Sequence, residues 1–178
     1  MGGFVALLRG INVGGHRKVP MAELRALADG LGLARVRTYV ASGNLVFDSE
    51  EDGAALEARL EGAIAGRFGF AVDVVVRSAE AWTALHRGNP MPEESAREPS
   101  KVMVTIGKRA ATDADVAALR ARASPNERVE RVGEAIWLWF GDGAGRSKLG
   151  AAPAGKDVWT TRNWRTVAAI EAMLGGDG

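Results

Sequence analysis

The chain has 178 residues, 47% of them hydrophobic and 25% charged, so it can bury a substantial core in one domain or in two small, closely packed halves. Its 23 basic and 22 acidic side chains nearly cancel, which removes a global electrostatic reason for indiscriminate binding to nucleic acid or anionic lipid. The absence of cysteine excludes disulfides, thiol nucleophiles and zinc sites built on sulfur. With no signal peptide or apolar membrane span recognisable, the sequence predicts a cytoplasmic protein that does not enter a membrane.

The first half carries the pattern of a βαββαβ unit, in which apolar runs of strand length alternate with helical periodicity. In chain order we expect a strand over 4–11, a helix from Pro20 to Gly32, a hairpin of 36–41 and 45–48, a helix after a Ser49 cap that ends at Gly69, and a strand over 72–77. This order is the split-βαβ arrangement of a ferredoxin-like fold.

The second half repeats much of this order. In chain order we expect a helix after a Ser78 cap, a strand over 101–106, a helix with a capping box at Thr112 and Asp115, a hairpin of 127–132 and 135–140, and a final helix from Thr160 or Thr161 to Gly175. The predicted fold is therefore α+β, with two ferredoxin-like (βαββαβ-related) subdomains packed together. The predicted parts are residues 1–87 with the following helix included, a linker over 88–99, and a related α+β half with the terminal helix over 100–178.

The loop that follows the first strand is rich in glycine and basic residues, and it is the first candidate binding site. An unpaired guanidinium is costly to bury, so Arg9 in its apolar run must reach water, pair with a carboxylate or face a ligand; we favour the ion pair. Glycines allow backbone N–H groups to approach an oxyanion, and nearby cations add charge-assisted contacts. The candidate ligand-binding residues of this loop are Arg9, Asn12, Gly14, Gly15 and Lys18, with Arg17 as a further cation. The loop is not a nucleotide-binding P-loop, because His16-Arg17 stand where that motif needs Lys followed by Ser or Thr.

Two further segments are candidates for the same site. Ser42, Gly43 and Asn44 could present a hydroxyl and an amide to a ligand, although turn geometry alone explains them and is the favoured interpretation. The segment Thr160-Thr161-Arg162-Asn163-Trp164 is interpreted as a helix N-terminus, which suits anion binding and simple capping equally well. Its candidate ligand-binding residues are Thr161, Arg162, Asn163 and Trp164.

Other motifs indicate no chemistry. His16 and His86 show no metal-ligand spacing, so no metal site is predicted. No serine lies in a nucleophile elbow. The segment Gly141-Asp-Gly-Ala-Gly-Arg146 lacks the third glycine of a dinucleotide loop and is interpreted as a flexible connection. The sequence leaves open whether the protein is an enzyme, and it identifies no cofactor.

Four motifs together resemble the bacterial family known as domain of unknown function 1697, over almost the whole chain. They are Ala6-Leu-Leu-Arg-Gly-Ile-Asn-Val-Gly-Gly15, Thr38-Tyr-Val-Ala-Ser-Gly-Asn44, Ser147-Lys-Leu149 and Thr160-Thr-Arg-Asn-Trp164. The resemblance implies an α+β fold with two ferredoxin-like subdomains and no known reaction. Where the family pattern reads Asn-Pro-Phe-Pro, this chain has Asn89-Pro90-Met91-Pro92, which removes the aromatic side chain there.

Three hypotheses about function follow. The first is a protein that binds a small anionic or phosphorylated ligand in a cleft between the first strand–helix loop and the N-terminus of the final helix. The second is a nucleic-acid-binding module that stacks bases on an open sheet face, for which Tyr39 is the one suitable aromatic residue of the first hairpin. The third is a structural or self-association module without a ligand, present as a monomer or a homodimer.

Overall fold

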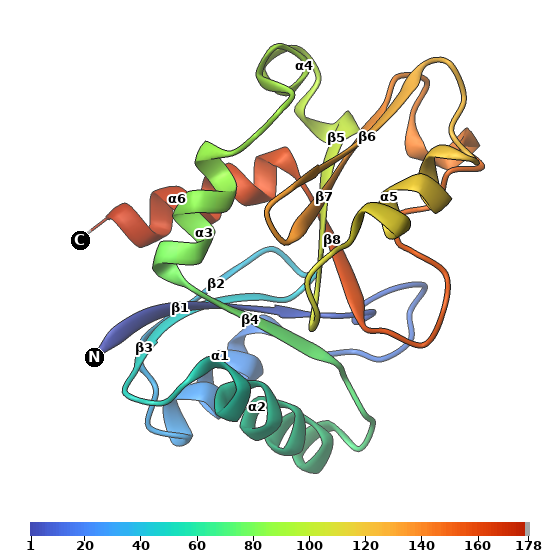
Figure 1. Ribbon diagram of the computed structural model, residues 1–178. Coiled ribbons are helices and arrows are strands. Elements are labelled where there is room, and N and C mark those ends of the chain that lie inside the picture. Colours follow the sequence, from blue (N-terminus) through green and yellow to red (C-terminus); the bar gives the residue numbers. More distant parts are fainter. Residues whose placement is uncertain (177–178) are drawn as a thin grey trace. The chain divides into compact units, whose positions relative to one another are not determined.

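The computed structural model describes residues 1–176, and the chain forms two compact units. The first unit comprises Met1–Thr83 and the chain from Ala169 onward, and the second comprises Ala84–Ala168. Each unit contains one four-stranded antiparallel sheet with helices, so the fold is α+β (Figure 1). Residues 177 and 178, the end of the predicted second half, lie outside the described residues.

The first unit follows the predicted βαββαβ order. Its elements are β1 (Gly2–Leu8), α1 (Met21–Gly30), β2 (Ala34–Tyr39), β3 (Asn44–Ser49), α2 (Gly53–Phe68), β4 (Val74–Ser78) and the first residues of α3 (Ala79–Arg87). The sheet order is β2-β3-β1-β4, with every neighbouring pair antiparallel. Because β1 lies in the centre of the sheet, the loop that leaves it starts beside both β3 and β4.

Both faces of this sheet are buried. On one face, α1 and α2 pack their apolar stripes against the strands (Figure 1), and the buried members of this core include Ala6, Leu8, Phe47, Leu24 and Leu60. On the other face, Val5, Leu7, Val46 and Val75 are at most 1% exposed. The end of α6 (Trp164–Gly175) lies on this second face, since the Arg37 guanidinium donates to the Met173 carbonyl oxygen at 2.7 Å.

The helix caps of the first unit differ from the prediction at one position. Helix α2 is capped by Asp52, whose side chain accepts a hydrogen bond from the Ala55 N–H, and not by Ser49. The reason is that Ser49 still pairs with Gly2 as the last residue of β3, so the chain cannot turn into the helix there. Gly69 ends α2 in the left-handed conformation, as predicted.

The second unit repeats the sheet order of the first. Its elements are the end of α3, α4 (Pro92–Arg97), the 3₁₀ turn η1 (Pro99–Lys101), β5 (Val102–Gly107), α5 (Asp113–Arg120), β6 (Glu127–Val132), β7 (Ala135–Phe140), the 3₁₀ turn η2 (Ala144–Arg146), β8 (Trp159–Asn163) and the start of α6. The sheet order is β6-β7-β5-β8, again antiparallel throughout. The core on one face joins Leu119 of α5 to Leu138 and Trp159 of the sheet.

Residues 88–99, expected to be a linker, contain helix α4, and two of their side chains, Met91 and Ser95, are buried. Met91 is fully buried, so it fills the position of the family's aromatic residue as a core side chain. Asn89 holds this segment in place by accepting the Met91 N–H and donating to the Ser95 hydroxyl, each at 2.8 Å. The Pro-rich break is therefore an ordered turn into a short helix.

The prediction that the final helix starts at Thr160 or Thr161 is wrong. Both threonines lie in β8, where Thr161 pairs with Thr105 and Arg162 pairs with Val104 of β5. Tryptophan and threonine favour strands, and the edge of β5 offers them a backbone ladder. Helix α6 starts at Trp164 instead, and the Asn163 side chain accepts the Thr166 N–H at 3.1 Å in the manner of an N-cap.

Candidate functional site

The candidate loop of the first unit is held in one conformation by the side chain of Asn12. Its Nδ2 donates to the carbonyl oxygens of Val19 at 3.0 Å and Ala41 at 2.8 Å, while its Oδ1 accepts the Val19 N–H at 2.8 Å. Asn12 adopts a positive φ of 54°, which asparagine tolerates better than most residues with a Cβ. Asn12 thus joins both ends of the loop and connects them to the hairpin of β2 and β3, so its amide serves the structure.

The turn of that hairpin lies directly against the loop. The Leu8 N–H donates to the Gly43 carbonyl oxygen at 2.8 Å, and a Cβ on Gly43 would lie 2.7 Å from the Ile11 Cδ1 atom. The buried Asn44 amide donates to the Tyr39 carbonyl oxygen and the Ser42 hydroxyl. Ser42 and Gly43 lie in the turn, as favoured, whereas Asn44 is the first residue of β3 and its amide bonds across the turn to Tyr39. The structure therefore brings the loop and the turn together.

The cations of the loop are exposed and differ in what they contact. Arg9 lies one residue beyond β1 and forms an ion pair with Asp73 at 3.3 Å, with about half of each side chain exposed. This confirms the ion pair expected for Arg9. Arg17 lies 5.3 Å from the Phe70 ring centroid and donates to the Ala71 carbonyl oxygen. Lys18 is exposed, and no ion pair or hydrogen bond of its ammonium is found within residues 1–176.

Gly14 and Gly15 form the tip of the loop, with φ values of 60° and 77°. A Cβ at either glycine would meet no atom within 4 Å, so the tip is open to solvent on that side. The neighbouring Val13 is 67% exposed, although valine is normally buried. The tip is therefore an accessible backbone surface flanked by His16, Arg17 and Lys18.

The closing motif has structural contacts in the second unit. Arg162 is 8% exposed and donates to the Thr160 hydroxyl at 2.8 Å and the Thr161 carbonyl oxygen at 3.0 Å. Burial lowers the pKa of the Arg162 guanidinium to about 10. The Thr161 hydroxyl lies 2.7 Å from that of Thr105. Because this segment is a strand, the predicted helix N-terminus does not exist at Thr161.

Trp164 belongs to a group of aromatic rings. Its ring stacks on that of His86 at a centroid distance of 4.9 Å and lies 5.9 Å from that of Trp137. Trp137 is fully buried, while Trp139 is half-buried. His86 therefore serves as an aromatic packing partner of Trp164.

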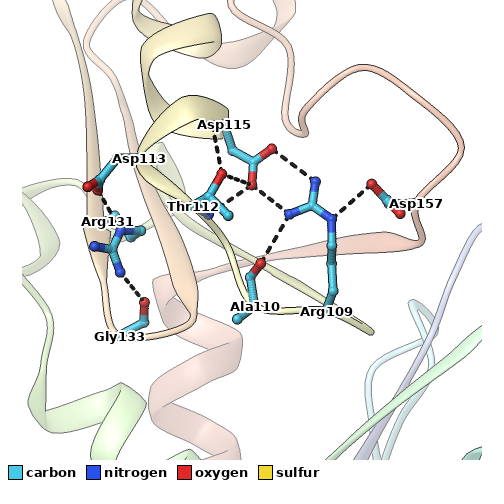
Figure 2. Close-up of polar contacts among 8 residues, drawn as sticks. All are labelled: Arg109, Ala110, Thr112, Asp113, Asp115, Arg131, Gly133 and Asp157. Atoms are coloured by element: carbon cyan, nitrogen blue, oxygen red, sulfur yellow. Dashed lines mark hydrogen bonds and ion pairs between the residues drawn. The ribbon is translucent and has the colours of Figure 1, made fainter.

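Sequence reasoning missed an ion-pair network that Figure 2 shows around Arg109. Its guanidinium reaches Asp115 at 2.7 Å and Asp157 at 2.9 Å, and it lies 4.8 Å from the Trp159 ring centroid. Hydrogen bonds from Arg109 and Thr112 hold the pKa of the Asp115 carboxyl well below its ordinary value, and the two carboxylates raise the pKa of Arg109. Asp115 was predicted as half of the capping box with Thr112, and this is confirmed. The network uses all its charges internally, which marks it as structural.

Within the described residues, no group of three or more histidine and carboxylate side chains could hold a metal ion. The helices of residues 1–176 also include none that combines the length and apolar character needed to cross a bilayer.

Comparison with known proteins identifies the family and the fold. The family model described as "Protein of unknown function (DUF1697)" matches residues 1–137. A solved structure, that of the conserved bacterial protein SP0830 from Streptococcus pneumoniae, is similar with a TM-score of 0.73 and 26% sequence identity. The similarity covers 97% of this chain and 98% of the other. The search of curated proteins gave no match.

Proposed function

Since this chain belongs to the family described as "Protein of unknown function (DUF1697)", whose description names no activity, we propose a function from the site: the loop over residues 9–18 binds a small anionic or phosphorylated ligand. The observation that carries the proposal is the clamp made by Asn12. It ties the backbone at the two ends of the loop together, so little backbone conformational entropy is lost when a ligand binds at the exposed glycine tip.

The charges of the loop suit an anion. Lys18 offers three N–H donors that no described residue occupies. About half of the Arg9 side chain is exposed, and its ion pair with Asp73 uses Nη1, so its guanidinium retains donors for a ligand. An exposed pair of this kind contributes little stability, so a ligand can compete with it. The open backbone at Gly14 and Gly15 lets a phosphate or carboxylate oxygen approach the chain closely. Arg17 is held by Phe70 and Ala71 and adds positive charge beside the tip.

A thermal-shift screen with inorganic phosphate, sugar phosphates, nucleotides and carboxylates tests the proposal, because a ligand that binds only the folded state raises its apparent stability. We expect at least one phosphorylated compound to raise the melting temperature. Replacement of Lys18 by Gln should remove that shift while leaving the melting temperature of the free protein unchanged. The matched control is Lys156→Gln, which changes the same charge at an exposed lysine outside the loop. A screen without a selective hit, or equal losses in both variants, would refute the proposal.

The nucleic-acid hypothesis is not favoured by the first unit. Base stacking on a sheet needs an exposed face with aromatic side chains, and the second face of this sheet carries buried Val5, Leu7 and Val46. Of the predicted cleft between Arg9 and Arg162, the proposal keeps only the loop that contains Arg9. The segment around Thr161, expected to be a helix N-terminus, is part of strand β8.

The remaining parts of the proposal concern fold class and setting. The strand order of each sheet supports a ferredoxin-like assignment for both units. A cytoplasmic location is proposed from the cysteine-free composition. Light scattering over a range of protein concentrations distinguishes the two alternatives, a monomer and a homodimer.

A further inference from the structure

The second unit contains a hollow of about 740 Å³ at residues 141–148, which begin with the glycine-rich segment 141–146 predicted to be a flexible connection. Four cationic side chains and two acidic ones line it: Lys101, Arg122, Arg146, Lys148, Glu127 and Asp142. The whole chain carries a net charge of only +1, so positive charge is concentrated at this place. The volume falls in the range of small-ligand sites.

Within the described residues, Glu127 and Asp142 form no ion pair with the cations of the hollow, whose charged lining has a formal excess of two positive charges. The Glu127 carboxylate accepts the Ser124 N–H at 2.9 Å, and the Asp142 carboxylate accepts the Asn126 amide at 3.0 Å. Both carboxylates are thus engaged by neutral donors. Elsewhere the pattern is different, since arginines such as Arg109 and Arg128 each pair with two carboxylates.

The cations at the hollow retain donors for a ligand. Within residues 1–176, Arg146 and Lys148 form no ion pair or side-chain hydrogen bond, and Arg122 makes only a 3.4 Å contact with the Ala152 carbonyl oxygen. The Ser147 hydroxyl accepts the Leu149 N–H at 2.9 Å, which leaves its own proton available. These four side chains present charged and neutral donors along one short stretch of surface.

The segment that carries Arg146, Ser147 and Lys148 is anchored to the sheet, whereas Arg122 lies just after α5. The Lys101 ammonium donates to the Gly141 carbonyl oxygen at 3.0 Å and pairs with Glu98 at 2.7 Å. The Gly141 N–H also donates to the Asn126 carbonyl oxygen at 2.9 Å. A Cβ at Gly141 would lie 2.4 Å from that same oxygen, so only glycine allows this close approach. The connection is therefore attached at its start, and the cations follow within seven residues.

From this arrangement we infer that the hollow binds a small ligand with adjacent phosphate groups, and that Arg122, Arg146 and Lys148 are its charged contacts with Ser147 as a neutral donor. Adjacent phosphates match the set because several cations with free donors lie together, so charge-assisted hydrogen bonds provide the affinity. The site consists of residues of the second unit, whereas the loop of the proposed function belongs to the first unit.

Isothermal titration calorimetry of the full chain with inorganic tripolyphosphate tests this inference, with a nucleoside triphosphate titrated in parallel. We expect saturable binding of both, weakened by added salt because the contacts are ionic. Tighter binding of the nucleoside triphosphate would show that the base also contributes. The absence of saturable binding of either compound at low ionic strength would overturn the inference.

A pair of double variants separates the hollow from general surface charge. Arg146→Gln with Lys148→Gln should weaken tripolyphosphate binding at least tenfold. The control Arg87→Gln with Arg165→Gln removes the same charge from exposed arginines that do not line the hollow, and should change affinity less than twofold. Equal losses in the two double variants would refute the site.

Amide chemical-shift changes in the unaltered protein provide a measurement that needs no variant. Tripolyphosphate should shift the resonances of residues 143–148. Shifts confined to residues 14–18 would overturn this inference while supporting the proposed function, and shifts confined to 143–148 would support the hollow without supporting the loop.

Discussion

The Asn12 side chain allows a quantitative prediction about the candidate loop, because the partner of each of its three hydrogen bonds is a backbone group of stated burial. Two of them satisfy the N–H and carbonyl groups of Val19, a residue with no exposed surface. The third reaches the exposed Ala41, where water can replace it. Leaving two buried backbone groups without partners costs about 3 kcal/mol in total, at roughly 1–2 kcal/mol each.

Two substitutions separate this cost from backbone strain. Asn12→Gly removes the side chain but tolerates the φ of 54°, so the free energy of unfolding should fall by about 3 kcal/mol. Asn12→Ala loses the same hydrogen bonds and adds the left-handed conformation of a residue with a Cβ, about 1 kcal/mol more. Urea unfolding followed by circular dichroism measures both values. As a control, the slope of the free energy of unfolding against urea concentration, the m value, should be unchanged.

Hydrogen exchange provides the local test of the same reasoning. The Val19 amide should lose protection in both variants, whereas an amide in the centre of the second sheet, such as that of Val104, should lose only what the global destabilisation dictates. The prediction is wrong if the free energy of unfolding of Asn12→Gly lies within about 0.5 kcal/mol of the parent value, which is the low end for a single hydrogen bond, and the Val19 amide stays protected. Asn12 would then not fix the loop.

Two further predictions concern stability. Gly43→Ala should lower the free energy of unfolding by about 3 kcal/mol, because the added Cβ would overlap the Ile11 and Leu8 side chains. The control Gly32→Ala has a similar φ but open space around the added Cβ, so it should cost only about 1 kcal/mol. Equal losses of stability in chemical denaturation would contradict this reasoning. Asp115→Asn should lower the free energy of unfolding by about 1 kcal/mol at pH 7 by weakening the capping box. Since the pKa of Asp115 is depressed in the folded state, the stabilisation by its charge is present above about pH 4 and is lost as the pH falls below that value. The free energies of unfolding of the parent protein and the variant should therefore converge in acid. A difference between them that stays constant down to about pH 2 would contradict the role of the Asp115 charge.

Elements with strong local signals were predictable from the sequence. Helix α2 has a long apolar stripe and a glycine stop, and the hairpin of β2 and β3 has turn residues whose conformations are specific to such turns. The capping box of Thr112 and Asp115 is likewise a local pattern and is present. In each case the residues that determine the element lie within a few positions of one another.

Strand β8 was not predictable in the same way, because its partner is distant in the chain. Thr160 and Thr161 have hydroxyl groups that suit a helix cap and β-branched side chains that suit a strand, so local propensity does not decide between them. The decision comes from β5, more than fifty positions earlier, whose edge pairs with these residues. The helix start predicted at Thr160 or Thr161 was wrong for that reason. The ion pair of Arg109 with Asp157 was not predictable for a similar reason, since the two residues lie far apart in the sequence.

Comparison of the two sheets explains where the hollow of the second unit comes from. Both have the same strand order, so the connection from β3 to β4 in the first corresponds to that from β7 to β8 in the second. The first connection is the sixteen-residue helix α2, whose apolar residues fill the core beside the sheet. The second spans residues 141–158, all described, and contains only the three-residue turn η2 in place of a helix. Leu149 and Ala152 of this connection pack in the core without a helix, while the glycines and basic residues of 141–148 line the hollow. Filling the core therefore constrains α2, whereas the chain over 141–148 is free to carry the charges proposed to bind phosphate.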